Sequence, residues 1–252
     1  MYGLPFPQID PIIIHLWGPI ALRWYNLAYI VGFGLGYAGV IWWINARQQL
    51  QRPLVDNAFH WVLISVLMGG RIGEFLFYPQ PLEHFLYIWQ GGMSFHGALL
   101  GLIIGIYLFS RRYQQPFLTW IDHISLVAPM GLFWGRLANF INEELIGRVT
   151  DLPWAVRFPS GGYLPRHPTQ IYEAIFEGFV LFIALNTVAY RTSLLKKPGH
   201  LSGLFLIGYG LFRFGIEAFK VPDGMIGPLT TGQALCLPMV VVGLILVFRK
   251  QA

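Results

Sequence analysis

The sequence predicts an all-α polytopic membrane protein with about seven transmembrane helices, the N-terminus outside and the C-terminus inside. The first observation is composition: 55% of the 252 residues are apolar and only 12% are charged, whereas soluble domains carry roughly 25% charged residues. The mean hydropathy is accordingly high, at +0.55. The second observation is that long apolar stretches recur along the chain. The third is that Lys and Arg gather at alternate ends of these stretches.

The apolar stretches define the expected helices, because a spanning helix needs about 20 mostly apolar residues. Seven stretches qualify, at about 20–45, 55–78, 92–110, 117–140, 168–190, 201–219 and 230–248. The first is too long for a cleaved signal peptide, and no small-residue cleavage site follows it. Since the spans fill most of the chain, we expect a single integral-membrane domain over residues 1–252.

The positions of the cations predict the orientation, because cytoplasmic loops carry the excess of Lys and Arg. Nine cations follow the first, third, fifth and seventh spans, and four lie in loops on the other side. The nine are Arg47, Arg52, Arg111, Arg112, Arg191, Lys196, Lys197, Arg249 and Lys250. The four are Arg148, Arg157, Arg166 and Lys220. This distribution also accounts for the net charge of +5, so we expect no nucleic-acid partner.

The longest connection between spans, about 143–167, is expected outside the membrane. Its prolines and glycines are typical of an ordered loop or short arm.

Several charges remain in or near the spans, where a central charge costs about 2.5–3.5 kcal/mol and must face a protein interior or a wet cavity. They are Arg23, Arg71, Arg136, Arg213, Asp56, Glu74, Asp122, Glu173, Glu177 and Glu217. Structural pairing at i,i+3 or i,i+4 explains Arg71 with Glu74 as well as a functional role does. Arg213 and Glu217 are spaced at i,i+4 in the same way, but here a functional role is favoured, because Arg136 offers a second guanidinium from another helix. Two guanidinium forks suit a phosphate, and the abundant anion in a bilayer is a lipid headgroup.

Two further regions carry candidate site residues. The fourth span ends in Asn139, Asn142 and Glu144, interleaved with apolar residues, which indicates an amphipathic edge open to lipid and to the outside. His96 opens the third span, and imidazole titrates near neutrality, so His96 is a candidate for proton transfer. The alternative is a hydrogen-bonded structural histidine.

Other polar residues do not form a recognisable site. His15, His60, His123 and His167 lack the spacing of metal ligands, so we expect no metal. The lone Cys236 lies in an apolar span and is interpreted as a small hydrophobe. Phosphate-binding loops, dinucleotide fingerprints and hydrolase elbows are missing from the sequence, and we expect no cofactor.

Motifs along nearly the whole chain resemble those of the bacterial phosphatidylglycerol–prolipoprotein diacylglyceryl transferases. Residues 135–148 resemble that family's signature, and residues 96–101 are similar to its His-Gly-Gly-Leu-Ile-Gly motif. Further similarities lie at Arg23-Trp24-Tyr25, Gly69-Gly70-Arg71, residues 166–173, and residues 210–213 leading to Glu217. The chain departs from the family pattern at Asn26, Ala98 and Ala138.

The resemblance implies a multi-pass enzyme of the bacterial cytoplasmic (inner) membrane. It would transfer the diacylglyceryl group of phosphatidylglycerol, a membrane lipid, to the lipobox cysteine thiol of a prolipoprotein signal peptide. A thioether would form and glycerol phosphate would leave, as the first step of lipoprotein maturation.

The site residues fit the needs of that reaction. Arg136 and Arg213 would hold the phosphate, and His96 would take the thiol proton, with Glu144 as the alternative base. Expected substrate-binding residues are Tyr25, Arg71, Asn139, Asn142, Arg148 and Glu217.

Two rival functions, a transporter and a scaffold, fit the sequence less well than a transferase. A lipid or solute transporter often has two repeated halves, but the His96 and Arg136 motifs occur without a second copy. A scaffold role leaves the costly in-span charges without a purpose.

Overall fold

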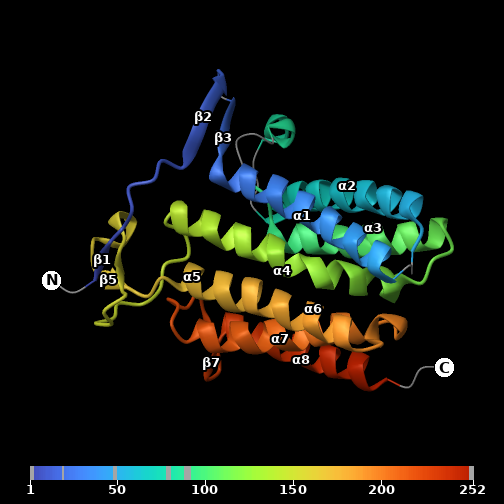
Figure 1. Cartoon of the computed structure of the whole chain (residues 1–252). Coiled ribbons are helices and arrows are strands. Elements are labelled where there is room, and N and C mark those ends of the chain that lie inside the picture. Colours follow the sequence, from blue (N-terminus) through green and yellow to red (C-terminus); the bar gives the residue numbers. More distant parts are fainter. Residues whose placement is uncertain (1–2, 19, 48–49, 78–80, 88–91, 250–252) are drawn as a thin grey trace.

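Long helices lying roughly side by side form the body of the molecule, with short strands and loops gathered toward one end (Figure 1). The computed structural model describes residues 3–18, 20–47, 50–77, 81–87 and 92–249. The helices are α1 (Trp24–Arg47), α2 (Arg52–Phe77), α3 (Phe95–Arg112), α4 (Phe117–Ile141), α5 (Thr169–Glu173), the π-helical turn η4 (Ala174–Val180), α6 (Leu181–Arg191), α7 (His200–Glu217) and α8 (Thr231–Phe248). Short 3-10 turns lie at η1 (Leu82–Leu86), η3 (Pro159–Gly161) and η5 (Leu194–Lys196).

Five helices of the described chain are long and apolar enough to cross a membrane. They are α1, α2, α4, α8 and the continuous unit Thr169–Arg191, which comprises α5, η4 and α6. A polytopic, mostly helical membrane protein is therefore confirmed. The helices α3 and α7 have 18 residues each and lie at the expected third and sixth spans.

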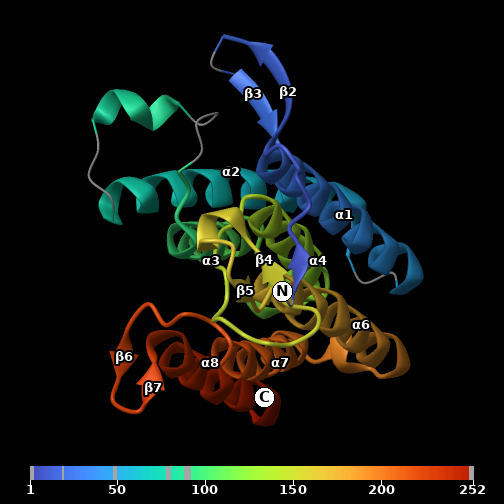
Figure 2. The ribbon, with the colours of Figure 1, turned by 90° about the vertical axis from the view of Figure 1, so that its left-hand side faces the viewer.

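The first helix begins a few residues beyond the predicted start of the first span. The sequence placed it at about residue 20, but an antiparallel hairpin of β2 (Ile12–Trp17) and β3 (Ile20–Arg23) precedes α1, which begins at Trp24. Trp24 closes the base of this hairpin, since its backbone N–H donates to the Pro11 carbonyl (3.3 Å) and its Nε1 donates to the Asp10 carbonyl (3.0 Å). Residues 20–23 read Ile-Ala-Leu-Arg, an apolar stretch that can form a strand as well as the start of a membrane helix, and here it pairs with β2. The hairpin projects from the bundle in Figure 2.

Glycines bring α2 and α3 into close contact. A Cβ on Gly69 would lie 2.4 Å from the Gly97 carbonyl oxygen, and one on Gly97 would lie 2.3 Å from the Gly69 carbonyl oxygen. Such distances are prohibitive, so these two backbones touch directly, as in small-xxx-small pairs of membrane helices.

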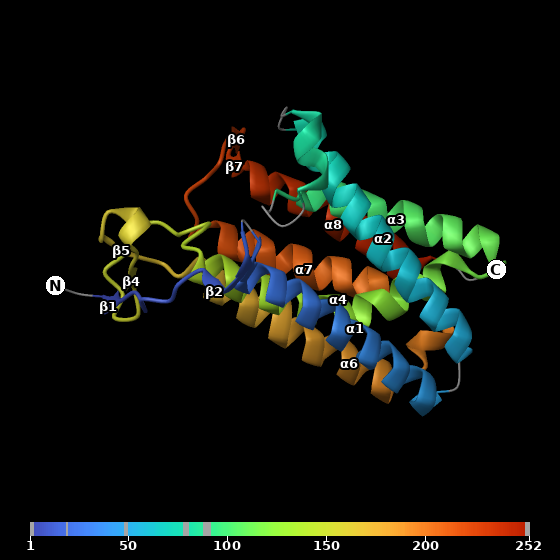
Figure 3. The same cartoon turned by 90° about the horizontal axis from the view of Figure 1, so that it is seen from above.

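The segment 143–167 is ordered, as predicted. Its strand β4 (Val156–Arg157) lies between β1 (Leu4–Pro5) and β5 (Pro165–Arg166) in a small sheet. A small apolar cluster of Phe6, Val156 and Phe158 supports that sheet. Figure 3 shows the sheet beyond the ends of the helices, on the side where α4 ends and α5 begins. A further hairpin, β6 (Met225–Ile226) with β7 (Leu229–Thr230), connects α7 to α8.

Candidate active site

Two arginines from different helices meet at one buried carboxylate. Arg136 of α4 places its Nε 3.1 Å from Oε2 of Glu173, the last residue of α5. Arg213 of α7 forms an ion pair through its Nη1 with the other oxygen of the same carboxylate. The expectation that Arg136 and Arg213 come together is therefore confirmed, and Glu173 is the group that joins them.

Three more charged residues complete what we call the Arg–Glu cluster. Glu177 lies 3.5 Å from Arg136 Nη2 and 3.8 Å from Arg213 Nη1. Glu217 lies 3.3 Å from Arg213 Nη2, the i,i+4 contact that the sequence suggested. Lys220 places its Nζ 3.0 Å from Glu173 Oε1. The cluster thus holds three cations and three carboxylates, so its formal charge is zero.

Exposure within the Arg–Glu cluster is uneven. The side chains of Glu173 and Glu177 are 0% exposed and that of Glu217 is 3% exposed, whereas Arg136 and Arg213 are 16% and 19% exposed. Full burial is tolerable for the carboxylates because each is paired. The arginines therefore present the accessible face of the cluster.

The π-helical turn η4 positions Glu177 against α4. A Cβ on Gly178 would lie 2.7 Å from the Cβ of Phe133 and 2.8 Å from its Cα, so η4 and α4 are in backbone contact there. Single π turns in helices often occur at functional sites. Only glycine at position 178 allows the approach that brings Glu177 within reach of Arg136.

Open space adjoins Arg136 on its own helix. A Cβ on Gly135, the residue before Arg136, would meet no atom within 4 Å.

Glu144 is held in place by the polar residues that end α4. Asn139 Nδ2 donates to Glu144 Oε2 (2.6 Å) and Asn142 Nδ2 donates to Oε1 (3.2 Å). The Gln170 amide donates to the Glu144 carbonyl, and Thr169 Oγ1 donates to the Leu145 carbonyl at 2.8 Å. The loop after α4 is thereby fastened to the first turn of α5, and it includes Glu143 and Leu145 at φ of 55°.

Arg148 contacts the chain just beyond α7 through both its side chain and its backbone. Its Nε donates to the Lys220 carbonyl (2.7 Å) and its backbone N–H donates to the Phe219 carbonyl (2.9 Å). Gly147 beside it cannot be larger, because a Cβ would lie 2.5 Å from the His167 carbonyl. Arg148 therefore braces the segment that carries Lys220.

The other predicted site residues lie elsewhere. His96 is exposed in the first turn of α3, where its ring packs edge-on against Phe95 (centroids 5.8 Å apart), and it forms no hydrogen bond or ion pair within the described ranges. Tyr25 lies in the first turn of α1 against Tyr29 (5.4 Å). Neither residue is joined to the Arg–Glu cluster by a bond among the described residues.

Arg71 is 5% exposed and its guanidinium holds the connection between α2 and α3. It donates to the carbonyls of Phe85 (2.9 Å), Gly92 (2.8 Å) and His84. These contacts describe a residue that orders a loop, and substrate binding by Arg71 stays a prediction.

Sequence reasoning missed three members of the cluster. Lys220 was counted with the loop cations, but it is 4% exposed. Glu173 and Glu177 were noticed as in-span acids without a role. The available signal was charge balance, since two arginines in a bilayer need acidic partners.

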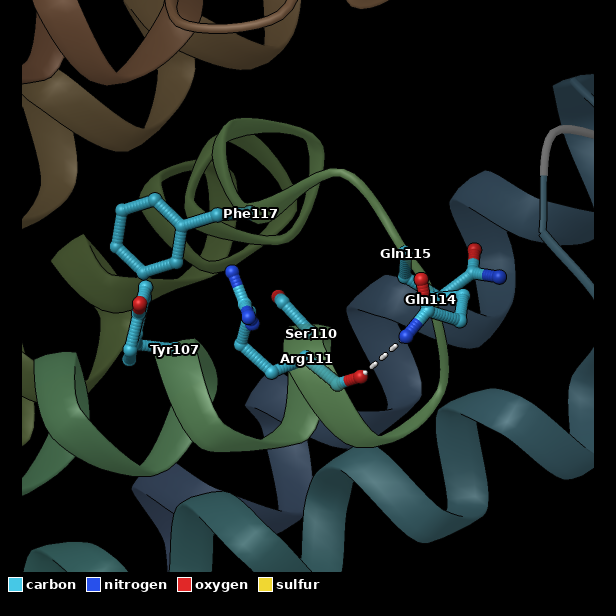
Figure 4. A pocket seen from close by; sticks show the side chains of 6 residues that line it. All are labelled: Tyr107, Ser110, Arg111, Gln114, Gln115 and Phe117. Carbon is cyan, nitrogen blue, oxygen red and sulfur yellow. Dashed lines mark hydrogen bonds between the residues drawn. The ribbon is translucent and has the colours of Figure 1, made fainter.

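The pocket drawn in Figure 4 lies away from these residues, at the connection between α3 and α4. It is lined by Tyr107, Ser110, Arg111, Gln114, Gln115 and Phe117. Among the residues described, no group of three or more His, Cys, Asp or Glu side chains is arranged to hold a metal ion.

Comparison with known proteins gives the family. The model of the family "Prolipoprotein diacylglyceryl transferase" matches residues 11–249. The chain belongs to this family. It is 45% identical to a phosphatidylglycerol–prolipoprotein diacylglyceryl transferase of Idiomarina loihiensis over 98% of this chain and 95% of that protein. It is 47% identical to the one of Rhodospirillum rubrum over 97% and 93% of the two chains. It is 46% identical to the one of Actinobacillus pleuropneumoniae serotype 3 over 99% and 98%.

Two of the departures from the family's usual residues are accommodated as small-for-small changes. Ala98 is half-buried in α3. Ala138 is 2% exposed within α4.

Proposed function

We propose that this protein transfers the diacylglyceryl group of phosphatidylglycerol to the lipobox cysteine thiol of a prolipoprotein, and that the Arg–Glu cluster binds the lipid phosphate. A carbon–sulfur bond forms at the glycerol carbon that bears the phosphate ester. The carbon–oxygen bond breaks, and its electron pair leaves with glycerol phosphate. The observation that carries the proposal is the meeting of Arg136 and Arg213 at Glu173.

The carboxylates orient the two guanidinium groups rather than saturate them. A guanidinium carries five N–H donors, more than the carboxylates engage here. The remaining donors of Arg136 and Arg213 can face the phosphate from their exposed side. Because they are held in advance, they stabilise the charge that develops on the leaving phosphate without a cost of reorganisation at the moment of reaction.

Two side chains are candidates for the base that accepts the proton of the lipobox thiol. Glu144 is connected to the Arg–Glu cluster through α4, since its partner Asn139 lies one turn beyond Arg136. His96 has an exposed ring in the first turn of α3. Both remain proposed bases.

Other side chains have supporting roles in this proposal. Asn139 and Asn142 orient Glu144, Glu217 orients Arg213, and Arg148 holds the segment that carries Lys220. We assign Tyr25 and Arg71 to the headgroup region.

The proposed setting is the bacterial inner membrane, crossed seven times by one domain. The N-terminus and 143–167 lie outside and the C-terminus inside. The distribution of Lys and Arg supports this orientation. The lipobox peptide then approaches the cluster from the side of 143–167.

Purified protein with phosphatidylglycerol and a lipobox peptide tests the proposal. Arg136→Ala or Arg213→Ala should lower transfer by about 100-fold or more, because each removes donors from the developing charge. Arg111→Ala is the control, since Arg111 is exposed at the opposite end of the bundle. Mass spectrometry reads the gain of diacylglycerol on the peptide, which a transporter does not produce. Transfer by Arg136→Ala at the wild-type rate would refute the phosphate-binding role.

A further inference from the structure

A buried carboxylate on α4 lies at the opposite end of the bundle from the Arg–Glu cluster. Asp122 is 1% exposed. It precedes Arg136 by 14 residues, which corresponds to about 21 Å along an α-helix. An isolated carboxylate at such a position is costly, so its partners explain why it is there.

Among the described residues, the hydrogen-bond partners of Asp122 all belong to the start of α7. Oδ2 accepts from the Gly199 N–H (2.7 Å), and Oδ1 accepts from the Ser202 N–H (2.7 Å) and lies 2.8 Å from Ser202 Oγ. Both carboxylate oxygens are thus engaged with a neighbouring helix.

The first turn of α7 depends on this contact. Its N-cap residue is Gly199, at φ 97°, which has no side chain to cap the free N–H groups. A helix usually obtains this cap from its own Ser, Thr, Asp or Asn, and an anion there is also favoured by the helix dipole. Here Asp122 of α4 supplies the cap, so the first turn of α7 is held at a fixed position along the axis of α4.

The same two helices carry the two arginines. Arg213 follows Ser202 by 11 residues, or about 16 Å of helix, in the same direction as Arg136 follows Asp122. The distance along α4 from Asp122 to Arg136 is thus about one turn longer than the distance along α7 from Ser202 to Arg213. Glu173 spans this offset, because its carboxylate contacts both guanidinium groups. Because a helix is stiff along its axis, a shift of the first turn of α7 displaces Arg213 relative to Arg136 by a similar distance.

We propose that Asp122 is a positioning residue, which sets the height of α7 on α4 and thereby the spacing of the Arg136 and Arg213 guanidinium groups. The inference rests on the proposed function, since it matters only if the two arginines act together on one phosphate. A misplacement of about 1 Å far from the reacting atoms can cost about 100-fold in rate.

Asp122→Asn tests the inference in the full-length protein in detergent with phosphatidylglycerol and a lipobox peptide. An amide has the same shape but replaces one acceptor oxygen with a donor, so one side of the cap is lost. We expect kcat per folded protein to fall about tenfold or more, with KM for the peptide changing by less than about threefold. Asp56→Asn is the matched control, because Asp56 is a carboxylate of α2 that accepts the Tyr37 hydroxyl of α1 at 2.6 Å, and neither helix carries a member of the cluster. This control should lower the melting temperature and keep kcat within about twofold.

Ser202 provides a milder variant in case Asp122→Asn does not fold. Ser202→Ala removes only the hydroxyl contact and should lower kcat about threefold, while Ser202→Thr keeps the hydroxyl and should retain kcat. If Asp122→Asn, or Ser202→Ala in its place, loses thermal stability but keeps the kcat of the Asp56→Asn control, Asp122 is merely a structural cap and the inference is wrong. Failure of the proposed function is a separate result, namely wild-type turnover by Arg136→Ala.

Discussion

Replacement of Gly232 by alanine should disturb the ion pair between Glu217 and Arg213. Gly232 lies in the first turn of α8, and a Cβ there would be 2.5 Å from Glu217 Oε1 and from its carboxyl carbon. That is about 0.9 Å short of the 3.4 Å of an ordinary contact. The Glu217 carboxylate must therefore move, and a shift of this size is enough to take its 3.3 Å contact with Arg213 Nη2 to about 4 Å.

Gly232→Ala should lower both stability and activity. Alanine favours a helix over glycine by about 1 kcal/mol, but displacing the buried Glu217 carboxylate from its ion pair costs more than that, so the melting temperature should fall. Loss of the Glu217 contact leaves Arg213 less well oriented, and a loss of about 1.4 kcal/mol in transition-state stabilisation corresponds to a tenfold fall in kcat.

Thermal unfolding and transfer kinetics of the purified variant measure both effects. Gly131→Ala in α4 is the control, because a Cβ at that glycine would meet nothing within 4 Å. It should gain stability and keep its activity. If Gly232→Ala transfers diacylglyceryl groups as fast as the wild type, Glu217 does not orient Arg213.

Two further predictions concern charge and proton transfer. Lys220→Met should destabilise the protein by up to about 3–5 kcal/mol and weaken phosphatidylglycerol binding, because it leaves an excess of buried negative charge; Lys220→Arg should retain both properties. Thermal unfolding and the KM for the lipid measure this, and a Lys220→Met protein with normal values would contradict it. His96→Asn should slow turnover between about pH 6 and 8 if His96 is the base. An unchanged pH–rate profile together with an inactive Glu144→Gln variant would assign the base to Glu144 instead.

The membrane character and the meeting of the two arginines were predictable from the sequence because burial of charge in a bilayer is so costly. Arg136 and Arg213 had to find partners inside the protein, whatever the details of packing. The same argument pointed to Glu217 as the i,i+4 neighbour of Arg213, and that contact is present.

The burial of Lys220, in contrast, could not be predicted from the sequence. It follows α7 by three residues in a stretch that continues Val221-Pro222-Asp223, a composition typical of an exposed loop. Its burial depends on how the chain beyond α7 folds back against Glu173, and the local sequence does not encode that contact. The hairpin before α1 was not predicted for a related reason, since the apolar residues 20–23 can form either a strand or the start of a membrane helix.

The neutrality of the Arg–Glu cluster has a consequence for an enzyme in an energised membrane. A potential of 100 mV does about 2.3 kcal/mol of work on one elementary charge that crosses the whole bilayer. Three positive and three negative groups held within ion-pair distance experience nearly cancelling forces. The voltage across the membrane therefore does almost no work when the cluster moves as a whole along the bilayer normal.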